Sequence, residues 1–296
     1  MSHKHRANRY FSGKILVEQL IKRSGHRLSY FRLEDGSEWI YKQLARENWL
    51  GTIHHSQVCR NELLGFEINS WLAHHFPDYQ GGVKSQIVVE QDKIHLLRPY
   101  FKGAPVRLPS PEQAFFLGQV LARMHAMAKP EENFEYWPAI TWPPDFEPAP
   151  WMKEVNTLID QHSYYQKEYW VASHRDLHMG NLLWSEDKLA AIIDWESAGL
   201  THPFVDLIGL AVNCAGVADA VFRPQHFSMT LQGYQSVAPL PAEDELLWFL
   251  CFHSWLLWLI YIWKSKSHDL LKPSLDAMDT FRAHLALMKK IYWEKA

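Results

Sequence analysis

Alternating apolar and polar residues dominate the first third of the chain and predict β-strands. Three such runs lie between residues 14 and 44, and Asp35-Gly36 is a hairpin-turn signal between the second and third. Two further runs, at 85–90 and 93–99, follow a segment with helical spacing at about 57–76. The pattern predicts a five-stranded antiparallel layer packed against one helix.

After residue 98 the apolar positions take the spacing of helices, and several prolines mark a connector between the two regions. The sequence therefore predicts an α+β protein with two lobes, residues 1–98 and residues 99–296. The second lobe is expected to be mainly α-helical, and a proline-rich stretch at 133–151 is expected to form a packed loop. Its candidate helices cover residues 111–127, 152–166, 203–217, 243–264 and 268–293.

One apolar run approaches the length of a membrane span. Leu246–Trp263 contains only His253 and Ser254 as polar residues. Eighteen helical residues cover about 27 Å, just short of a hydrocarbon core of about 30 Å. We favour a buried helix of the second lobe and keep a membrane-tethered protein as the alternative.

Composition excludes several function classes. The 296 residues carry a net charge of −3, which does not favour nucleic acid or an anionic membrane as a partner. Three scattered cysteines cannot form a complete disulfide framework, and no leader-like apolar segment opens the chain, so we expect a cytoplasmic protein. The 17 histidines show no metal-binding spacing, so a structural metal is not expected.

The strongest chemical signal is the segment His174–Asn181, HRDLHMGN, followed by an apolar hairpin pattern that ends at Asp194-Trp195-Glu196. A loop and a hairpin can bring these groups to one metal–nucleotide site. Asp176 can accept a hydroxyl proton, whereas Asn181 and Asp194 offer the hard oxygen ligands that suit Mg²⁺ beside phosphates.

These motifs resemble the small-molecule kinases of the aminoglycoside phosphotransferase and choline kinase type, which share the protein-kinase fold. The similarity extends loosely over residues 14–211 and includes Leu117–His125, LGQVLARMH. The resemblance implies ATP and Mg²⁺ as cofactors, with Asp176 as catalytic base and Asn181 and Asp194 as metal ligands. It also implies that two residues give structural support, His174 and Asp206, the latter by bracing the catalytic loop.

The segment also matches the catalytic loop of protein kinases. Three departures argue against that subclass: Asp194-Trp195-Glu196 replaces Asp-Phe-Gly, no Ala-Pro-Glu follows, and His178 replaces the usual lysine. A protein substrate is therefore kept only as a minor alternative.

In the first lobe, Lys42 in the third predicted strand is the candidate partner of the nucleotide phosphates. The adjacent helix should supply a carboxylate that holds the ammonium group, and both Glu62 and Glu67 qualify. We favour Glu62, although the sequence leaves the choice open. The resulting roles are a nucleotide-binding lobe at 1–98 and a catalytic and acceptor-binding lobe at 99–296.

Two further nucleotide contacts follow from lobe order and from the resemblance. Backbone amides near Ser24 and Gly25 are candidates to cap a phosphate, although a single glycine equally suits a solvated loop. The connector from Leu97 to Phe101 is expected to hydrogen-bond adenine, with Tyr100 or Phe101 packing nearby.

The expected reaction is transfer of the ATP γ-phosphoryl group to a hydroxyl of a small molecule. Four tryptophans of the C-terminal helices (Trp248, Trp255, Trp258 and Trp263) suit either a hydrophobic core or a cation–π wall, so a choline, ethanolamine or thiamine-like alcohol is slightly preferred. The acidic run 243–245 suits an aminoglycoside or a helix start. A regulatory nucleotide-binding module without transfer is the alternative. The acceptor, the choice of ATP or GTP, the oligomeric state and any antibiotic resistance stay open.

Overall fold

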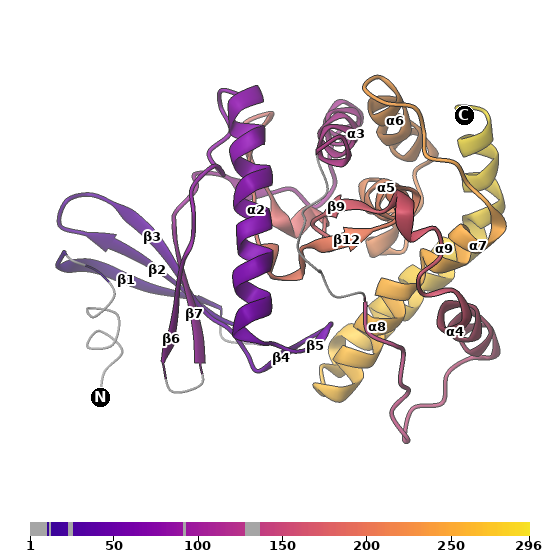
Figure 1. Cartoon of the computed structure of the whole chain (residues 1–296), viewed down its shortest axis with the longest axis horizontal. Helices are drawn as coiled ribbons and strands as arrows, with labels where there is room; N and C mark the ends of the chain where they lie inside the picture. Colours follow the sequence, from indigo (N-terminus) through magenta and orange to yellow (C-terminus); the bar gives the residue numbers. More distant parts are fainter. Residues whose placement is uncertain (1–10, 12, 23–25, 91–92, 128–136) are drawn as a thin grey trace.

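A computed structural model shows a sheet-rich N-terminal part joined to a helical C-terminal part, with helix α2 between the large sheet and the rest of the chain (Figure 1). The structure describes residues 11, 13–22, 26–90, 93–127 and 137–296. The predicted α+β class with two lobes is confirmed.

The elements have the following bounds. The helices are α2 (His55–His75), α3 (Pro111–His125), α4 (Pro150–His162), α5 (Pro203–Cys214), α6 (Pro224–Gln235), α7 (Glu245–Leu250), α8 (His253–Lys264) and α9 (Leu271–Trp293). The strands are β1 (Ile15–Lys22), β2 (Arg27–Leu33), β3 (Glu38–Gln43), β4 (Glu47–Asn48), β5 (Gly51–Thr52), β6 (Gln86–Glu90), β7 (Lys93–Pro99), β8 (Ala104–Pro105), β9 (Val171–Ser173), β10 (Leu182–Ser185), β11 (Lys188–Ile192) and β12 (Gly199–Thr201).

The large sheet has five antiparallel strands in the order β1-β2-β3-β7-β6, as predicted. The β2–β3 turn is also the predicted one, because Gly36 has a φ of 85° and the Ser37 amide donates to Asp35 Oδ1 at 2.9 Å. Val58 of α2 packs with Ile94 and Leu96 of β7 in one hydrophobic cluster. This contact fixes α2 on the sheet.

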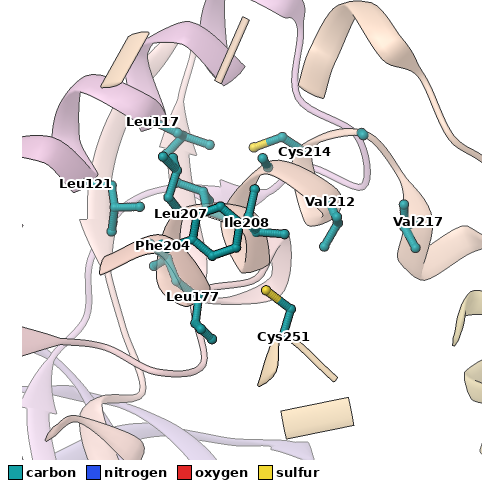
Figure 2. Close-up of a cluster of buried hydrophobic side chains, with 14 of the residues drawn as sticks. Leu117, Leu121, Leu177, Phe204, Leu207, Ile208, Val212, Cys214, Val217 and Cys251 are labelled. Carbon is teal, nitrogen blue, oxygen red and sulfur yellow. The ribbon is translucent and has the colours of Figure 1, made fainter. Parts of the chain in front are cut away.

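The C-terminal part is built around α5, whose apolar residues lie in the main core. Figure 2 shows Leu177 of the HRDLHMGN segment in the same cluster as Phe204 and Leu207 of α5. All three side chains are buried. Because Leu177 directly follows Asp176, the core anchors the segment that carries the predicted base.

The segment 243–264 was expected to be one helix, and this prediction is wrong. The chain forms α7 and α8, separated at Cys251 and Phe252. Phe252 stacks on Phe281 of α9 with ring centroids 4.5 Å apart, and the adjacent His253 lies 3.0 Å from the Pro138 carbonyl oxygen. These tertiary contacts therefore set the directions of α7 and α8.

The window Glu245–Lys264 is long and apolar enough to cross a membrane by composition, with a mean hydropathy of 1.7. However, 61% of this window is buried inside the protein. The burial supports a core segment over a membrane span.

Helix α6 was not predicted. It packs closely on α3 through glycines: a Cβ on Gly118 would lie 2.1 Å from the Thr230 oxygen, and one on Gly233 would lie 1.8 Å from the Phe115 oxygen. No helix was predicted for this segment, although Phe227, Leu231 and Tyr234 of α6 are buried at helical spacing.

Within the predicted loop 133–151, residues 137–149 are irregular and bury Trp137 and Ile140, whereas Pro150 and Trp151 already belong to α4. The prediction of a packed loop is therefore confirmed for residues 137–149.

Candidate active site

The predicted catalytic segment leaves strand β9 and turns sharply at Arg175, whose φ is 60°. Left-handed backbone is rare outside glycine and concentrates at functional sites. The buried Arg175 side chain stabilises this turn, because its Nε donates to the Ser197 carbonyl at 2.6 Å. A Cβ on Gly199 would lie 2.6 Å from the Arg175 Cζ atom, so the absence of a side chain at Gly199 makes room for the guanidinium.

His174 ties the catalytic segment to the strand that leads to Asp194. Its Nε2 lies 2.8 Å from the Ile193 carbonyl oxygen, and its Nδ1 accepts the Asp176 amide hydrogen at 3.3 Å. These partners assign a neutral ring with the proton on Nε2. Burial lowers the pKa of His174, which favours this neutral form.

Asn181 links the predicted base, Asp176, to the strand that leads to Asp194. Its side-chain nitrogen donates to the Asp176 carbonyl at 2.9 Å, and its own carbonyl accepts the Ile193 amide at 3.0 Å. The fold thus brings Asp176 and Asn181 beside the residue that precedes Asp194. With the side-chain nitrogen engaged, the amide oxygen is left for a ligand.

Asp194 adopts a φ of 67° and extends its carboxylate toward two buried cations. Oδ2 lies 3.1 Å from Lys42 Nζ, and Oδ1 lies 3.0 Å from Arg98 Nη2. Burial alone would raise the pKa of Asp194, but Lys42 and Arg98 outweigh it and hold the pKa well below its usual range. The carboxylate is therefore ionised and suited to a divalent cation.

Lys42 is buried at the centre of the site, and its ammonium also lies 2.5 Å from Glu196 Oε1. Burial would lower the pKa of Lys42, yet Asp194 and Glu196 outweigh this effect and raise it. Lys42 is thus a fixed positive charge. The expectation that an α2 carboxylate holds this lysine is corrected, since Glu196 makes the close contact.

Glu62 nevertheless lies at the site. It is 7% exposed, whereas Glu67 is exposed to solvent. Burial raises the pKa of Glu62, and Arg98 acts against this shift. Among the described residues, Glu62 Oε1 is a buried acceptor without a hydrogen-bond partner. The burial of Glu62 agrees with the preference for Glu62 over Glu67. However, the charge of Arg98 acts on the Glu62 carboxylate more strongly than that of Lys42 does.

Helix α2 is locked to the Asp194–Ser197 segment by two contacts. The Asn61 side chain donates to the Glu196 carbonyl at 2.6 Å. A Cβ on Gly65 would lie 2.4 Å from Trp195 Cγ, so only glycine allows this approach. The position of α2 therefore determines where Asp194 lies.

Asp176 faces a more open environment, with 35% of its side chain exposed. Burial of the remainder raises its pKa, and His178 and His174 act against the shift. His178 Nδ1 accepts the Gly180 amide hydrogen at 3.0 Å, which assigns the proton to Nε2, 3.9 Å from Asp176 Oδ1. His178 thus presents a donor beside the predicted base.

The structure describes only some of the residues that were predicted to contact the nucleotide. Ser24 and Gly25 lie outside the described residues. Leu97 is fully buried in β7, and the Tyr100 amide donates to the Glu38 carbonyl at 2.9 Å. Phe101 is buried and lines a small cavity together with Glu62. Adenine recognition by this connector stays a prediction.

Asp206 has a different partner from the one expected. Its Oδ2 lies 3.0 Å from His125 Nε2, and His125 Nδ1 lies 2.9 Å from the Tyr234 hydroxyl. Asp206 therefore joins α5 to α3 and α6 instead of bracing the catalytic loop directly.

The tryptophans and acidic residues that were candidates for acceptor binding make contacts within the protein. Trp248 is buried and donates to Glu243, and Trp258 donates to Ser274. Asp244 accepts the Leu247 amide at the start of α7, and Glu245 pairs with Lys289. The helix-start and core interpretations therefore fit these residues better than an acceptor site does.

The donors present fit a magnesium ion held jointly with phosphates. Asp194 and Asn181 supply one carboxylate and one amide oxygen, and Mg²⁺ commonly binds one or two protein groups plus phosphate oxygens. Within the described ranges, no group of three or more His, Cys, Asp or Glu could hold a metal without such help.

Sequence reasoning missed Arg98 and the role of Glu196. Arg98 follows four consecutive buried residues of β7, and a charge that continues such a strand is a readable signal of an internal ion pair. Its partner Asp194 is 96 positions away, so only the fold identifies the pair.

Comparison with known proteins decides the family. The model of the phosphotransferase enzyme family (APH) matches residues 92–240, half of the chain. The chain belongs to this family. The resemblance drawn from the HRDLHMGN segment is confirmed.

This phosphotransferase is 24% identical over 209 residues to homoserine kinase of Paraburkholderia xenovorans (strain LB400). The match covers 58% of the chain and 60% of that relative's length. Two solved structures share the fold. Amicoumacin kinase, in complex with AMP-PNP and Ca²⁺, has a TM-score of 0.64 at 13% identity, with 94% of each chain covered. Ethanolamine kinase of Plasmodium vivax has a TM-score of 0.61 at 11% identity, with 98% of this chain and 86% of that one covered.

Proposed function

We propose that this protein transfers the γ-phosphoryl group of ATP to a hydroxyl of a small molecule in a Mg²⁺-dependent reaction. The observation that carries the proposal is the cluster of Asp176, Asn181 and Asp194, linked by the Asn181–Asp176 hydrogen bond and completed by the buried Lys42. Phosphoryl transfer needs such positioned charges more than covalent chemistry.

Each residue has a defined task in this reaction. Asp176 orients the acceptor hydroxyl and takes its proton, and the Nε2–H of His178 is a donor to the incoming substrate. Lys42 binds phosphate oxygens and is held by Glu196. Asn181 and Asp194 hold the magnesium ion, which when bound neutralises charge on the transferring group.

For the acceptor, we propose a small alcohol that carries an amino or quaternary ammonium group. Three observations support this class: the relatives named homoserine kinase, the structural similarity to an ethanolamine kinase, and the similarity to a choline kinase of Streptococcus pneumoniae. Thiamine-like alcohols belong to this class, and sugars and aminoglycosides follow. The structural roles of Glu243 and Asp244 do not favour an acidic aminoglycoside site.

We also propose a role for each lobe and a cytoplasmic location for the protein. Residues 1–98 bind the nucleotide, and residues 99–296 supply the catalytic groups and the acceptor site. The three cysteines are free thiols, which suits the reducing cytoplasm.

An acceptor screen with γ-labelled ATP tests the proposal. Homoserine, choline, ethanolamine, thiamine, sugars and aminoglycosides are each incubated with the wild-type protein and with Asp194→Ala as the blank. Label transfer that requires Asp194 and Mg²⁺ supports the proposal. Mg²⁺-dependent ATP binding without transfer to any acceptor would instead favour a regulatory nucleotide-binding module.

A further inference from the structure

Arg98 is a buried cation that lies between two carboxylates from different parts of the fold. It hydrogen-bonds Asp194 Oδ1 at 3.0 Å and is 6% exposed. Burial would lower the pKa of Arg98, but Asp194 and then Glu62 raise it, so Glu62 is its second strong electrostatic partner. Arg98 thus connects the predicted metal ligand with helix α2.

This arrangement conflicts with metal binding. Both oxygens of Asp194 are engaged, one by Lys42 and one by Arg98. A divalent cation at Asp194 competes with these two positive charges for the same carboxylate. Loss of one of these contacts would lower the repulsion between the metal and the two cations.

Glu62 offers the position to which Arg98 can move. Its Oε1 is buried and accepts no hydrogen bond from the described residues, which is a costly state for a carboxylate. Glu62 and Arg98 line the same small cavity, along with Phe66, Ser85, Phe101 and Trp195. Both side chains therefore border the same open space.

We propose that Arg98 is a positioning residue that transfers from Asp194 to Glu62 when the metal–nucleotide complex binds. This inference rests on the proposed kinase function and deepens it. In the structure, Arg98 neutralises Asp194. On loading, its guanidinium donates to Glu62 Oε1, which releases Asp194 Oδ1 for the metal and gives this buried oxygen a hydrogen-bond donor.

The transfer also gives α2 a role in metal loading. Glu62 belongs to the helix whose Asn61 and Gly65 contact the Asp194–Ser197 segment. The helix thereby provides both the acceptor for Arg98 and the support that fixes Asp194.

The test measures how much Mg²⁺ is needed for nucleotide binding. Calorimetric titrations of AMP-PNP at a series of Mg²⁺ concentrations give the half-saturating Mg²⁺ for wild type, Glu62→Gln, Arg98→Met and the double variant. Glu67→Gln on the exposed face of α2 is the matched control. Binding of AMP-PNP without Mg²⁺ and the melting temperature without ligand are recorded for each protein.

We expect Glu62→Gln to raise the half-saturating Mg²⁺ about tenfold, because Arg98 then stays on Asp194. Arg98→Met should lower it, and the Glu62 substitution should have no further effect in the Arg98→Met background. An unchanged Mg²⁺ requirement in Glu62→Gln, or an equal change in both backgrounds, would overturn the proposal.

A crystal structure with Mg²⁺ and AMP-PNP gives a second test. The proposal expects an Arg98 nitrogen within about 3 Å of Glu62 Oε1. An Arg98 that stays on Asp194 Oδ1 would overturn it. A wild-type protein that shows no Mg²⁺-dependent nucleotide binding would overturn the kinase function itself, and the two failures are thereby distinguished.

Discussion

The Asn181 side chain donates a hydrogen bond to the backbone carbonyl of Asp176 at 2.9 Å. The two residues are five positions apart, and the bond closes the loop between them. It fixes the backbone at Asp176 and leaves the Asn181 amide oxygen available to a ligand. One contact therefore links the proposed base to a proposed metal ligand.

Asn181→Asp tests this link, because the substitution keeps an oxygen ligand and removes the donor. We expect turnover to fall about 10²-fold, as a small displacement of a positioned group can cause. Mg²⁺-dependent nucleotide binding should persist. Steady-state kinetics and calorimetry on the same preparation check both results, and undiminished turnover would show that the hydrogen bond does not position Asp176.

Gly65→Ala tests the contact between α2 and the metal-binding segment. The new Cβ would lie 2.4 Å from Trp195 Cγ, so the indole must move, and we expect a loss of about 1–3 kcal/mol in the free energy of unfolding. Nucleotide binding should weaken too, since Trp195 follows Asp194.

The matched control is Gly209→Ala in helix α5, where nothing lies within 4 Å of the added Cβ. This variant should keep or slightly raise stability, because alanine favours helix over glycine. Equal stability of the two variants in urea unfolding would contradict the proposed role of the Gly65 contact.

The pH dependence of turnover tests Asp176 as the base. Burial raises the pKa of Asp176, so the acid limb of the rate profile should lie above the ordinary aspartate value of about 3.9. His178, whose Nε2 lies 3.9 Å from Asp176 Oδ1, acts against this shift. His178→Gln removes this ring and should move the acid limb to higher pH. A limb that stays in place, or moves to lower pH, would exclude an electrostatic effect of His178 on the base.

His253 should make the stability of the fold depend on pH. Burial lowers its pKa to about 4, against about 6.5 in the unfolded chain. The unfolded state therefore binds more protons between these values, and stability is lost as the pH falls from 6.5 toward 4. The slope from one such group is at most about 1.4 kcal/mol per pH unit.

His253→Gln keeps a donor for the Pro138 carbonyl and removes the titration. Its free energy of unfolding should fall less steeply than that of wild type as the pH drops from 6.5 to 4. His74→Gln, at an exposed position of α2, is the control and should keep the wild-type slope. Urea unfolding at several pH values provides the comparison.

Local patterns predicted much of this protein. The alternation in residues 14–44 predicted three strands of the sheet, and the run from His174 to Glu196 contains the residues proposed for catalysis, because these features depend on residues close in the sequence. Long-range pairs could not be predicted in this way. The contact of Lys42 with Glu196 spans more than 150 positions, and His125 and Asp206 meet only when α3 and α5 pack together.

The break between α7 and α8 illustrates the same limit. The segment is apolar on nearly all sides, so its periodicity gave no sign of a bend. The contact of Phe252 with Phe281 depends on the position of α9, which the local sequence does not encode.

Turnover of Asp176→Asn, with the acceptor identified by the screen, tests the central claim most directly. The substitution removes the base and leaves Lys42, Asn181 and Asp194 in place. The account predicts a fall in kcat of about 10² to 10⁴, as for the loss of a positioned acid–base group, with Mg²⁺-dependent nucleotide affinity unchanged. A variant that binds nucleotide and turns over at the wild-type rate would contradict it.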